Sequence, residues 1–273
     1  MATKLAGAQQ LSITRIGGAF GARVDGIDLA HPLGEEGIAV LREAFLEHHV
    51  LLFPGQGHIT PAQQLAFARR WGEVILTPAP DKQHPEVPEI LVLDTHGEKP
   101  VTDMWHSDIT MEPEPPLGSF LLARVVPTGG DTIFANQYLA WDALSDGMKD
   151  MLDGMRAWHT GDTYASQGNY DPASFPRSLH PVVRTHPETG RKALFVNIVY
   201  TTCFEGWSET ESRGLLDYLC AHSVQPNFTF RHQWHQGDML MWDNRCLQHF
   251  GVADYGSQPR TMHRITIRGD VPV

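Results

Sequence analysis

Three side chains of the types that bind iron are spaced as a metal site requires. His106 and Asp108 lie two residues apart in the segment TDMWHSDITM, and His249 ends the downstream segment MLMWDNRCLQH. Side chains two residues apart on an extended strand point to the same face, so one ion can bind both His106 and Asp108. Two histidines and one carboxylate form the facial triad that leaves positions open on iron(II) for a chelating cosubstrate and O2, whereas zinc usually takes more nitrogen or sulfur. The pattern therefore predicts a mononuclear non-haem iron site.

Two arginines near the C-terminus are a second chemical signal. They matter because a His-x-Asp pair is weak evidence by itself in a chain that has 15 histidines. Arg260 and Arg264 follow His249 on the next predicted strand, and their even spacing puts both guanidinium groups on one face. Each could bind a carboxylate, sulfonate or phosphate through two parallel hydrogen bonds; the alternative is that both are exposed strand residues.

The charge balance limits the partners. The chain of 273 residues has 21 Lys and Arg against 32 Asp and Glu, a net charge of −11 without a long basic run. We therefore expect no binding to nucleic acid or to an anionic membrane surface. A small anionic organic molecule would need locally placed arginines in such a protein, which draws attention to Arg260 and Arg264.

The cysteines and the N-terminal segment predict a soluble, cytoplasmic protein. Cys203, Cys220 and Cys246 are far apart and form no CxxC pair, so neither a disulfide framework nor a zinc knuckle is indicated. The N-terminal segment has no apolar run of signal-peptide length, and no later segment approaches the roughly 20 apolar residues of a membrane span.

Periodicity and capping residues predict short strands with a few helices. Thr60 and Pro61 mark the start of one helix, and Ser208 with Glu211 forms a capping box at the start of another. We expect helices over 37–50, 60–72, 137–153 and 208–222, and strands within 11–30 and over 50–55, 118–126, 131–135, 193–198, 227–234, 238–243 and 261–268. A long, partly irregular segment is expected over 73–116. A second irregular segment is expected over 159–180 and could be a lid over a site.

Many short strands with peripheral helices predict a mainly β fold, either a sandwich or a jelly roll. No internal repeat, low-complexity tract or Ser/Gly-rich linker divides the chain. We therefore expect residues 1–273 to form a single domain.

Four motifs resemble those of a known enzyme family. WHSD, GGDT, WDNRCLQH and RTMHR resemble the taurine dioxygenase and phenoxyacetate-herbicide dioxygenase family of 2-oxoglutarate enzymes. The segments GARVDGIDL, VLLFPGQ, LAFARRWGE and HPVVRTHPETGRKALFVN are similar to the family in the same order, so the resemblance covers nearly the whole chain. It implies a double-stranded β-helix (jelly roll) core and a homo-oligomer.

The resemblance also implies a reaction and a set of roles. The iron(II) ligands would be the three residues named above, His106, Asp108 and His249. Thr132 and Arg260 would hold the distal carboxylate of 2-oxoglutarate, and Arg264 would face the anionic group of the primary substrate. Hydroxylation of a sulfonate, a sulfate ester or a carboxylate such as an aryloxyalkanoate would consume O2 and release succinate and CO2. No side chain is assigned as a general base, because protein groups here position the reactants and exclude water.

The chain departs from the taurine-type pattern at the substrate pocket. Taurine-type enzymes have a histidine and a tyrosine where this chain has Thr77 and Pro80, and an asparagine where it has Thr102. Ile109, Tyr200 and the 159–170 loop predict a more apolar pocket, which favours a substrate bulkier than taurine.

His159 opens the second irregular segment, and its family counterpart lies near the substrate. A structural role for His159 is the alternative. Trp105 and Trp242 are interpreted as core residues, because aromatic residues at apolar strand positions usually pack in the interior.

Other functions share parts of this pattern. The same ligands could support desaturation or cyclisation in a biosynthetic pathway, and the scaffold could be a jelly-roll binding protein without turnover. A zinc hydrolase would need a general base and no 2-oxoglutarate site, which the pair Thr132 and Arg260 disfavours. A halogenase needs the coordination position of the carboxylate for halide, and Asp108 occupies it.

Overall fold

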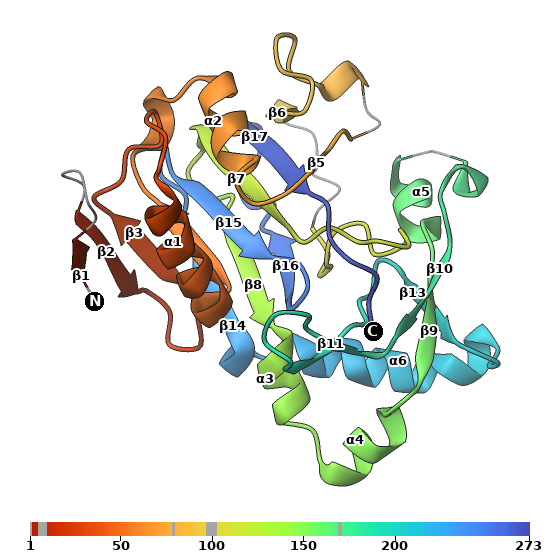
Figure 1. The fold of residues 1–273 in the computed structure, drawn as a ribbon. Coiled ribbons are helices and arrows are strands. Elements are labelled where there is room, and N and C mark those ends of the chain that lie inside the picture. Colours follow the sequence, from red (N-terminus) through yellow and green to blue (C-terminus); the bar gives the residue numbers. More distant parts are fainter. Residues whose placement is uncertain (1, 5–9, 78–79, 97–102, 169–170) are drawn as a thin grey trace.

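The largest element of the fold is a nine-stranded sheet (Figure 1). In the computed structural model, which describes residues 2–4, 10–77, 80–96, 103–168 and 171–273, its strand order is β1-β2-β3-β4-β15-β7-β17-β5, and β6 pairs with a further part of β17. These strands are β1 (Ala2–Lys4), β2 (Gln10–Arg15), β3 (Ala22–Asp25), β4 (Val50–Phe53), β5 (Val74–Ile75), β6 (Leu91–His96), β7 (Gly118–Val125), β15 (Met239–Asp243) and β17 (Pro259–Ile267). Its strand pairs are antiparallel except β3 with β4.

Three smaller sheets complete the β structure. The first has the order β14-β8-β16 and packs against the large sheet. The second has the order β10-β9-β13, and the third is the pair β11-β12. Their strands are β8 (Thr132–Asn136), β9 (Arg156–His159), β10 (Ser178–Pro181), β11 (Val183–Thr185), β12 (Lys192–Leu194), β13 (Thr201–Phe204), β14 (Thr229–His232) and β16 (Leu247–Gly251).

The helices lie around these sheets. They are α1 (Glu35–His48), α2 (Pro61–Ala68), α3 (Gln137–Asp142), α4 (Asp146–Leu152), α5 (Asp162–Gly168) and α6 (Glu209–Ser223), with short 3-10 turns at Gln56–His58, Pro80–Lys82, Pro172–Ser174 and Pro226–Phe228. Apolar residues of α1 and α2 pack on one face of the large sheet, and apolar residues of α3 and α6 share a separate cluster with β12. Figure 1 shows α1 and α2 beside the strands of the large sheet. The described residues contain no helix with the length and apolar character that crossing a membrane requires.

The large sheet is buried on both faces where it carries the core. In β15, Met239 and Met241 join the cluster under α1 and α2, whereas Leu240 and Trp242 point to the β14-β8-β16 sheet. This alternation follows from the pleat of a strand, which sends successive side chains to opposite faces. The large sheet and the β14-β8-β16 sheet therefore share a buried interior that lies between them.

The observed elements confirm much of the expected pattern. The helices expected over 37–50, 60–72 and 208–222 are α1, α2 and α6, and the capping boxes at Thr60 and Ser208 are both present. The single helix expected over 137–153 is wrong, because Ser145 caps a second helix by accepting a hydrogen bond from the Met148 N–H. The segment 159–180 is not irregular throughout, since it contains α5 and β10, and the strand expected over 193–198 ends at Leu194.

Candidate metal centre and active site

His106 and His249 face each other across one antiparallel β-bridge. His249 lies on β16, and His106 lies in the segment that precedes β7. The His106 N–H donates to the His249 carbonyl at 3.1 Å, and the His249 N–H donates to the His106 carbonyl at 2.7 Å. The two imidazole rings have centroids 4.2 Å apart. The main chain thus holds together two side chains that are far apart in sequence.

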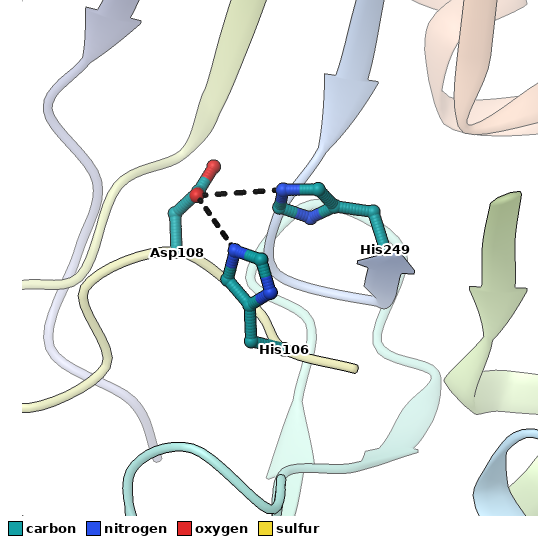
Figure 2. Close-up of side chains that lie close together, drawn as sticks. All are labelled: His106, Asp108 and His249. Carbon is teal, nitrogen blue, oxygen red and sulfur yellow. Dashed lines mark ion pairs between the residues drawn. The ribbon is translucent and has the colours of Figure 1, made fainter. Parts of the chain in front are cut away.

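Asp108 completes a compact group of three possible metal ligands (Figure 2). Its Oδ1 lies 3.7 Å from the His106 Nε2 and 3.6 Å from the His249 Nε2. All three ligand atoms lie within 4.8 Å of one another, and all three side chains are buried. The prediction that His106 and Asp108 share an extended strand is wrong, because the bridge ends at His106 and Asp108 opens a turn. The turn nevertheless brings the carboxylate to the histidines.

The protonation states of the group suit metal binding. Burial, helped by the neighbouring His106, lowers the pKa of His249 to about 3. Burial also lowers the pKa of His106, although the Asp108 carboxylate opposes that effect. Burial would raise the pKa of Asp108, but the positive Arg264 and the two imidazoles outweigh it and hold that pKa below its usual range. Neutral imidazoles and an ionised carboxylate are the forms that bind a metal ion.

The two oxygens of Asp108 have different partners. Oδ1 faces the histidines, whereas Oδ2 lies 2.5 Å from the Arg264 Nη2 and accepts a hydrogen bond from the Ser119 hydroxyl at 3.3 Å. Arg264 also donates to the Ser119 hydroxyl oxygen at 3.0 Å and lies over the Trp242 ring, 5.7 Å from its centroid. This division leaves one oxygen of Asp108 for a metal ion and fixes the other.

The orientation of both imidazoles fits a bound metal ion. The His106 Nδ1 lies 2.8 Å from the Met104 carbonyl, which can only accept, so Nδ1 carries the proton and Nε2 has a free lone pair. The His249 Nδ1 is buried and has no hydrogen-bond partner among the described residues. Packing against Trp242 and Phe134, together with the bridge, orients that ring instead. Two imidazole nitrogens and one carboxylate oxygen form the donor set of a facial iron(II) site.

Arg260 and Thr132 are placed as separate donors. Pairing between β17 and β6 is uninterrupted from Pro259 to Arg264, so Arg260 and Arg264 share one face of the strand. No carboxylate of the described chain forms an ion pair with the half-buried Arg260, and burial lowers its pKa. The Thr132 hydroxyl accepts a hydrogen bond from the Trp234 Nε1 at 3.0 Å, which leaves its own proton available for donation.

An apolar cluster lies directly beyond Asp108. Ile109 packs with Met104, Met111, Val199 and the buried Tyr200. Its φ of 48° places it in the left-handed region, which is rare for a β-branched residue. Ile109 and Tyr200 therefore belong to one apolar cluster next to Asp108.

The described contacts of the other expected substrate residues do not place them at the triad. The described hydrogen bond of Thr77 uses its carbonyl, which accepts from the Gln83 side chain, so it does not place the hydroxyl at the site. Thr102 lies outside the described residues. His159 is fully buried, with Nδ1 2.8 Å from the Thr110 hydroxyl and its ring stacked on Phe195. Those contacts favour a structural role for His159, in support of the turn that carries Asp108.

Two residues make contacts in the site that sequence reasoning missed. Ser119 contacts the Asp108 carboxylate and Arg264, and its only sequence signal is one hydroxyl in the apolar strand GSFLLARV. Trp242 is a core residue as predicted, but its ring centroid also lies 5.0 Å from that of His249. Both contacts depend on which strands become neighbours, which local patterns do not reveal.

The chain is similar to known dioxygenases. Residues 12–266 match the model of the taurine catabolism dioxygenase TauD, TfdA family. The chain is 33% identical to an alpha-ketoglutarate-dependent sulfate ester dioxygenase of Pseudomonas putida, over 97% of this chain and 92% of that protein. It is 34% identical to an alpha-ketoglutarate-dependent 2,4-dichlorophenoxyacetate dioxygenase of Cupriavidus pinatubonensis, over 93% and 96%. The crystal structure of AAD-2 in complex with Mn(II) and N-oxalylglycine superposes with a TM-score of 0.83 at 32% identity, covering 96% of this chain and 98% of that one.

Proposed function

The chain belongs to the taurine catabolism dioxygenase TauD, TfdA family, and from that membership we propose that it hydroxylates a small anionic organic substrate bulkier than taurine. It is a non-haem dioxygenase that depends on iron(II), 2-oxoglutarate and O2. Succinate and CO2 are the coproducts of such a reaction.

The observation that carries the residue assignment is the convergence of His106, Asp108 and His249. Two Nε2 atoms and one carboxylate oxygen face one another in a buried group, with protonation states that leave each free to bind. Iron held by these three residues would supply the oxidation of 2-oxoglutarate by O2 that hydroxylation of a substrate carbon requires.

The protein groups bind and orient the reactants. Arg260 offers a half-buried guanidinium without a carboxylate partner in the described chain, and Thr132 offers a hydroxyl proton. We assign both to the distal carboxylate of 2-oxoglutarate, because hydrogen bonds between charged groups are stronger and more directional than neutral ones. The burial of the triad limits access of water to the reaction.

The substrate pocket combines one cation with apolar surface. Arg264 forms an ion pair with Asp108, and Ile109 belongs with the buried Tyr200 to an apolar cluster next to the same residue. A sulfate ester or an aryloxyalkanoate has both a charged group and a hydrophobic body. The related sulfate ester and 2,4-dichlorophenoxyacetate dioxygenases support these two classes.

The architecture fits the same proposal. The large sheet and the β14-β8-β16 sheet face each other across a shared core, which supports a double-stranded β-helix (jelly roll). The family match over residues 12–266 supports a single catalytic domain.

Anaerobic titration tests the proposed site. The iron(II) protein would be titrated with 2-oxoglutarate while the weak visible charge-transfer band of the chelate is recorded, and then with a matched alkyl sulfate, alkyl sulfonate and aryloxyacetate. We expect the band to appear with 2-oxoglutarate and to shift with one of the three anions. Absence of the band from protein with bound iron would reject the site, and a band that no anion shifts would reject the substrate classes.

Substitution of Arg264 should separate substrate binding from cosubstrate binding. We expect Arg264→Ala to raise the KM of the anionic substrate by roughly 10- to 150-fold, since hydrogen bonds to charged groups contribute about 1.5–3 kcal/mol. Because Arg264 also pairs with the Asp108 carboxylate, the comparison is made on protein with bound iron(II). In that protein the KM of the anionic substrate should rise much more than the dissociation constant of 2-oxoglutarate or the KM of an uncharged substrate analogue. An effect confined to 2-oxoglutarate would mean that the roles of Arg260 and Arg264 are reversed.

A further inference from the structure

The side-chain amide of Asn244 forms hydrogen bonds with both the N–H and the carbonyl of Asp108. It lies between β15 and β16 and is fully buried. Its Oδ1 accepts a hydrogen bond from the Asp108 N–H at 2.6 Å. Its Nδ2 donates to the Asp108 carbonyl at 3.1 Å and to the Pro116 carbonyl at 3.2 Å. One side chain therefore binds both backbone groups of the residue that carries the carboxylate of the triad.

Asp108 needs such an anchor because no strand fixes its backbone. His106 and His249 are held by their bridge, but Asp108 opens a turn. The next residue, Ile109, has a φ of 48°, and a conformation of that kind costs on the order of 1–3 kcal/mol in a non-glycine residue. It persists only where the surroundings enforce it. The two hydrogen bonds from Asn244 immediately before Ile109 are such a constraint.

Asn244 is itself rigidly placed. Its N–H donates to the Leu117 carbonyl at 2.9 Å, and the adjacent Gly118 allows the close approach of β7 and β15, where a Cβ would lie 2.2 Å from the Trp242 carbonyl oxygen. The preceding residue, Asp243, is fully buried and accepts hydrogen bonds from Arg245 at 2.9 and 2.8 Å. Because these contacts fix the main chain of Asn244, its side chain can hold the Asp108 main chain in one position.

We propose that Asn244 is a positioning residue of the metal centre, which sets the place of the Asp108 carboxylate through the Asp108 backbone. Arg264 and Ser119 fix one oxygen of the carboxylate, and Asn244 fixes the main chain from which it extends. A neutral amide achieves this without adding charge to a site that already contains an arginine and a carboxylate. The inference rests on the proposed role of Asp108 as a metal ligand.

Gln56 provides a matched control. It is also buried, and its Oε1 accepts from the Leu29 N–H at 2.9 Å, while its Nε2 donates to the Ile27 and Pro54 carbonyls at 3.2 and 2.9 Å. It thus makes the same set of bonds as Asn244, to a part of the main chain without metal ligands. Gln56→Ala and Asn244→Ala remove equivalent hydrogen bonds and differ in the residue that those bonds hold.

The test measures metal affinity and metal geometry rather than turnover. We expect Asn244→Ala to weaken Mn(II) binding by roughly 10- to 100-fold, the usual cost of losing a group that orients a metal ligand. The absorption bands of the Co(II) protein should also change. Gln56→Ala should lower the Tm of the metal-free protein but leave the Mn(II) affinity and the Co(II) spectrum as in the wild type. Asn244→Ser, which keeps a hydroxyl near the Asp108 N–H, should fall between Asn244→Ala and the wild type, and it replaces that variant if the alanine protein does not fold.

Two other results have distinct meanings. Wild-type Mn(II) affinity and an unchanged Co(II) spectrum in a folded Asn244 variant, with only the Tm lowered, would show a purely structural residue and overturn the inference. Asp108→Ala serves as the reference and should lose most of its Mn(II) affinity. If Asp108→Ala binds Mn(II) as the wild type does, the ligand assignment itself fails, and the role of Asn244 fails with it.

Discussion

The His106→Ala protein is expected to fold but to lose iron-dependent succinate formation altogether. The substitution removes one of three protein donors from the proposed site. It leaves both hydrogen bonds of the bridge to His249, because these bonds use main-chain atoms. The loss of activity should therefore occur without loss of the fold. Succinate release by iron-loaded protein and the 2-oxoglutarate charge-transfer band are the two measurements.

His222 is the control for this substitution. It is also a buried histidine, and its Nε2 lies 2.8 Å from the Ala140 carbonyl, as the His106 Nδ1 lies near a carbonyl. His222→Ala should lower stability and retain iron-dependent turnover in the folded fraction. Near-native succinate formation by purified, iron-loaded His106→Ala protein would reject the ligand assignment.

The Arg260→Ala protein should lose affinity for 2-oxoglutarate while it keeps its metal ion. A guanidinium without a carboxylate partner in the described chain is poised to bind an external carboxylate, and hydrogen bonds between charged groups contribute about 1.5–3 kcal/mol. The expected rise in the dissociation constant is thus roughly 10- to 150-fold. Anaerobic titration of the iron(II) protein with 2-oxoglutarate measures it, and the Mn(II) affinity without 2-oxoglutarate should not change.

Arg268 is the matched residue for this second prediction. It follows β17, its side chain is 46% exposed, and it pairs with Glu73 at 3.1 Å. Arg268→Ala should leave the affinity for 2-oxoglutarate as in the wild type. If Arg260→Ala instead raises only the KM of the primary substrate, the assignment of the two strand arginines is wrong.

Elements with local signals were predictable from the sequence. The helices that begin after Thr60 and Ser208 both show the expected capping boxes, since the cap and its partner lie three residues apart. The apolar strands β4, β7 and β15 also follow from short runs of residues. The break between α3 and α4 had a local signal too, in the capping side chain of Ser145, but the helical pattern across it obscured that signal.

The residues of the candidate site were predictable from the sequence, but the contacts that support them were not. Residue type and motif order predict a group of His106, Asp108 and His249, and the structure brings these three side chains together. The bridge between the histidines forms between distant segments, which local patterns do not reveal. The contacts of Asn244 and Ser119 with Asp108 likewise depend on the neighbours that tertiary packing creates. The turn at Asp108 replaces the expected strand because hydrogen bonds from side chains take the place of a β-ladder.

A metal ion bound by both His106 and His249 would join the two ends of a long loop, which their β-bridge also brings together. A chain segment of about 140 residues lies between the two histidines, and bringing its ends together has an entropic cost that grows slowly with loop length. An ion that binds only the closed loop favours closure by mass action, by about 2.7 kcal/mol when its concentration is 100 times its dissociation constant. Fraying of β16 would separate His249 from His106 and release the ion. Resistance of the whole chain to unfolding should therefore rise and fall with iron supply, so that the fraction of enzyme surviving heat or protease reports on the iron available to it.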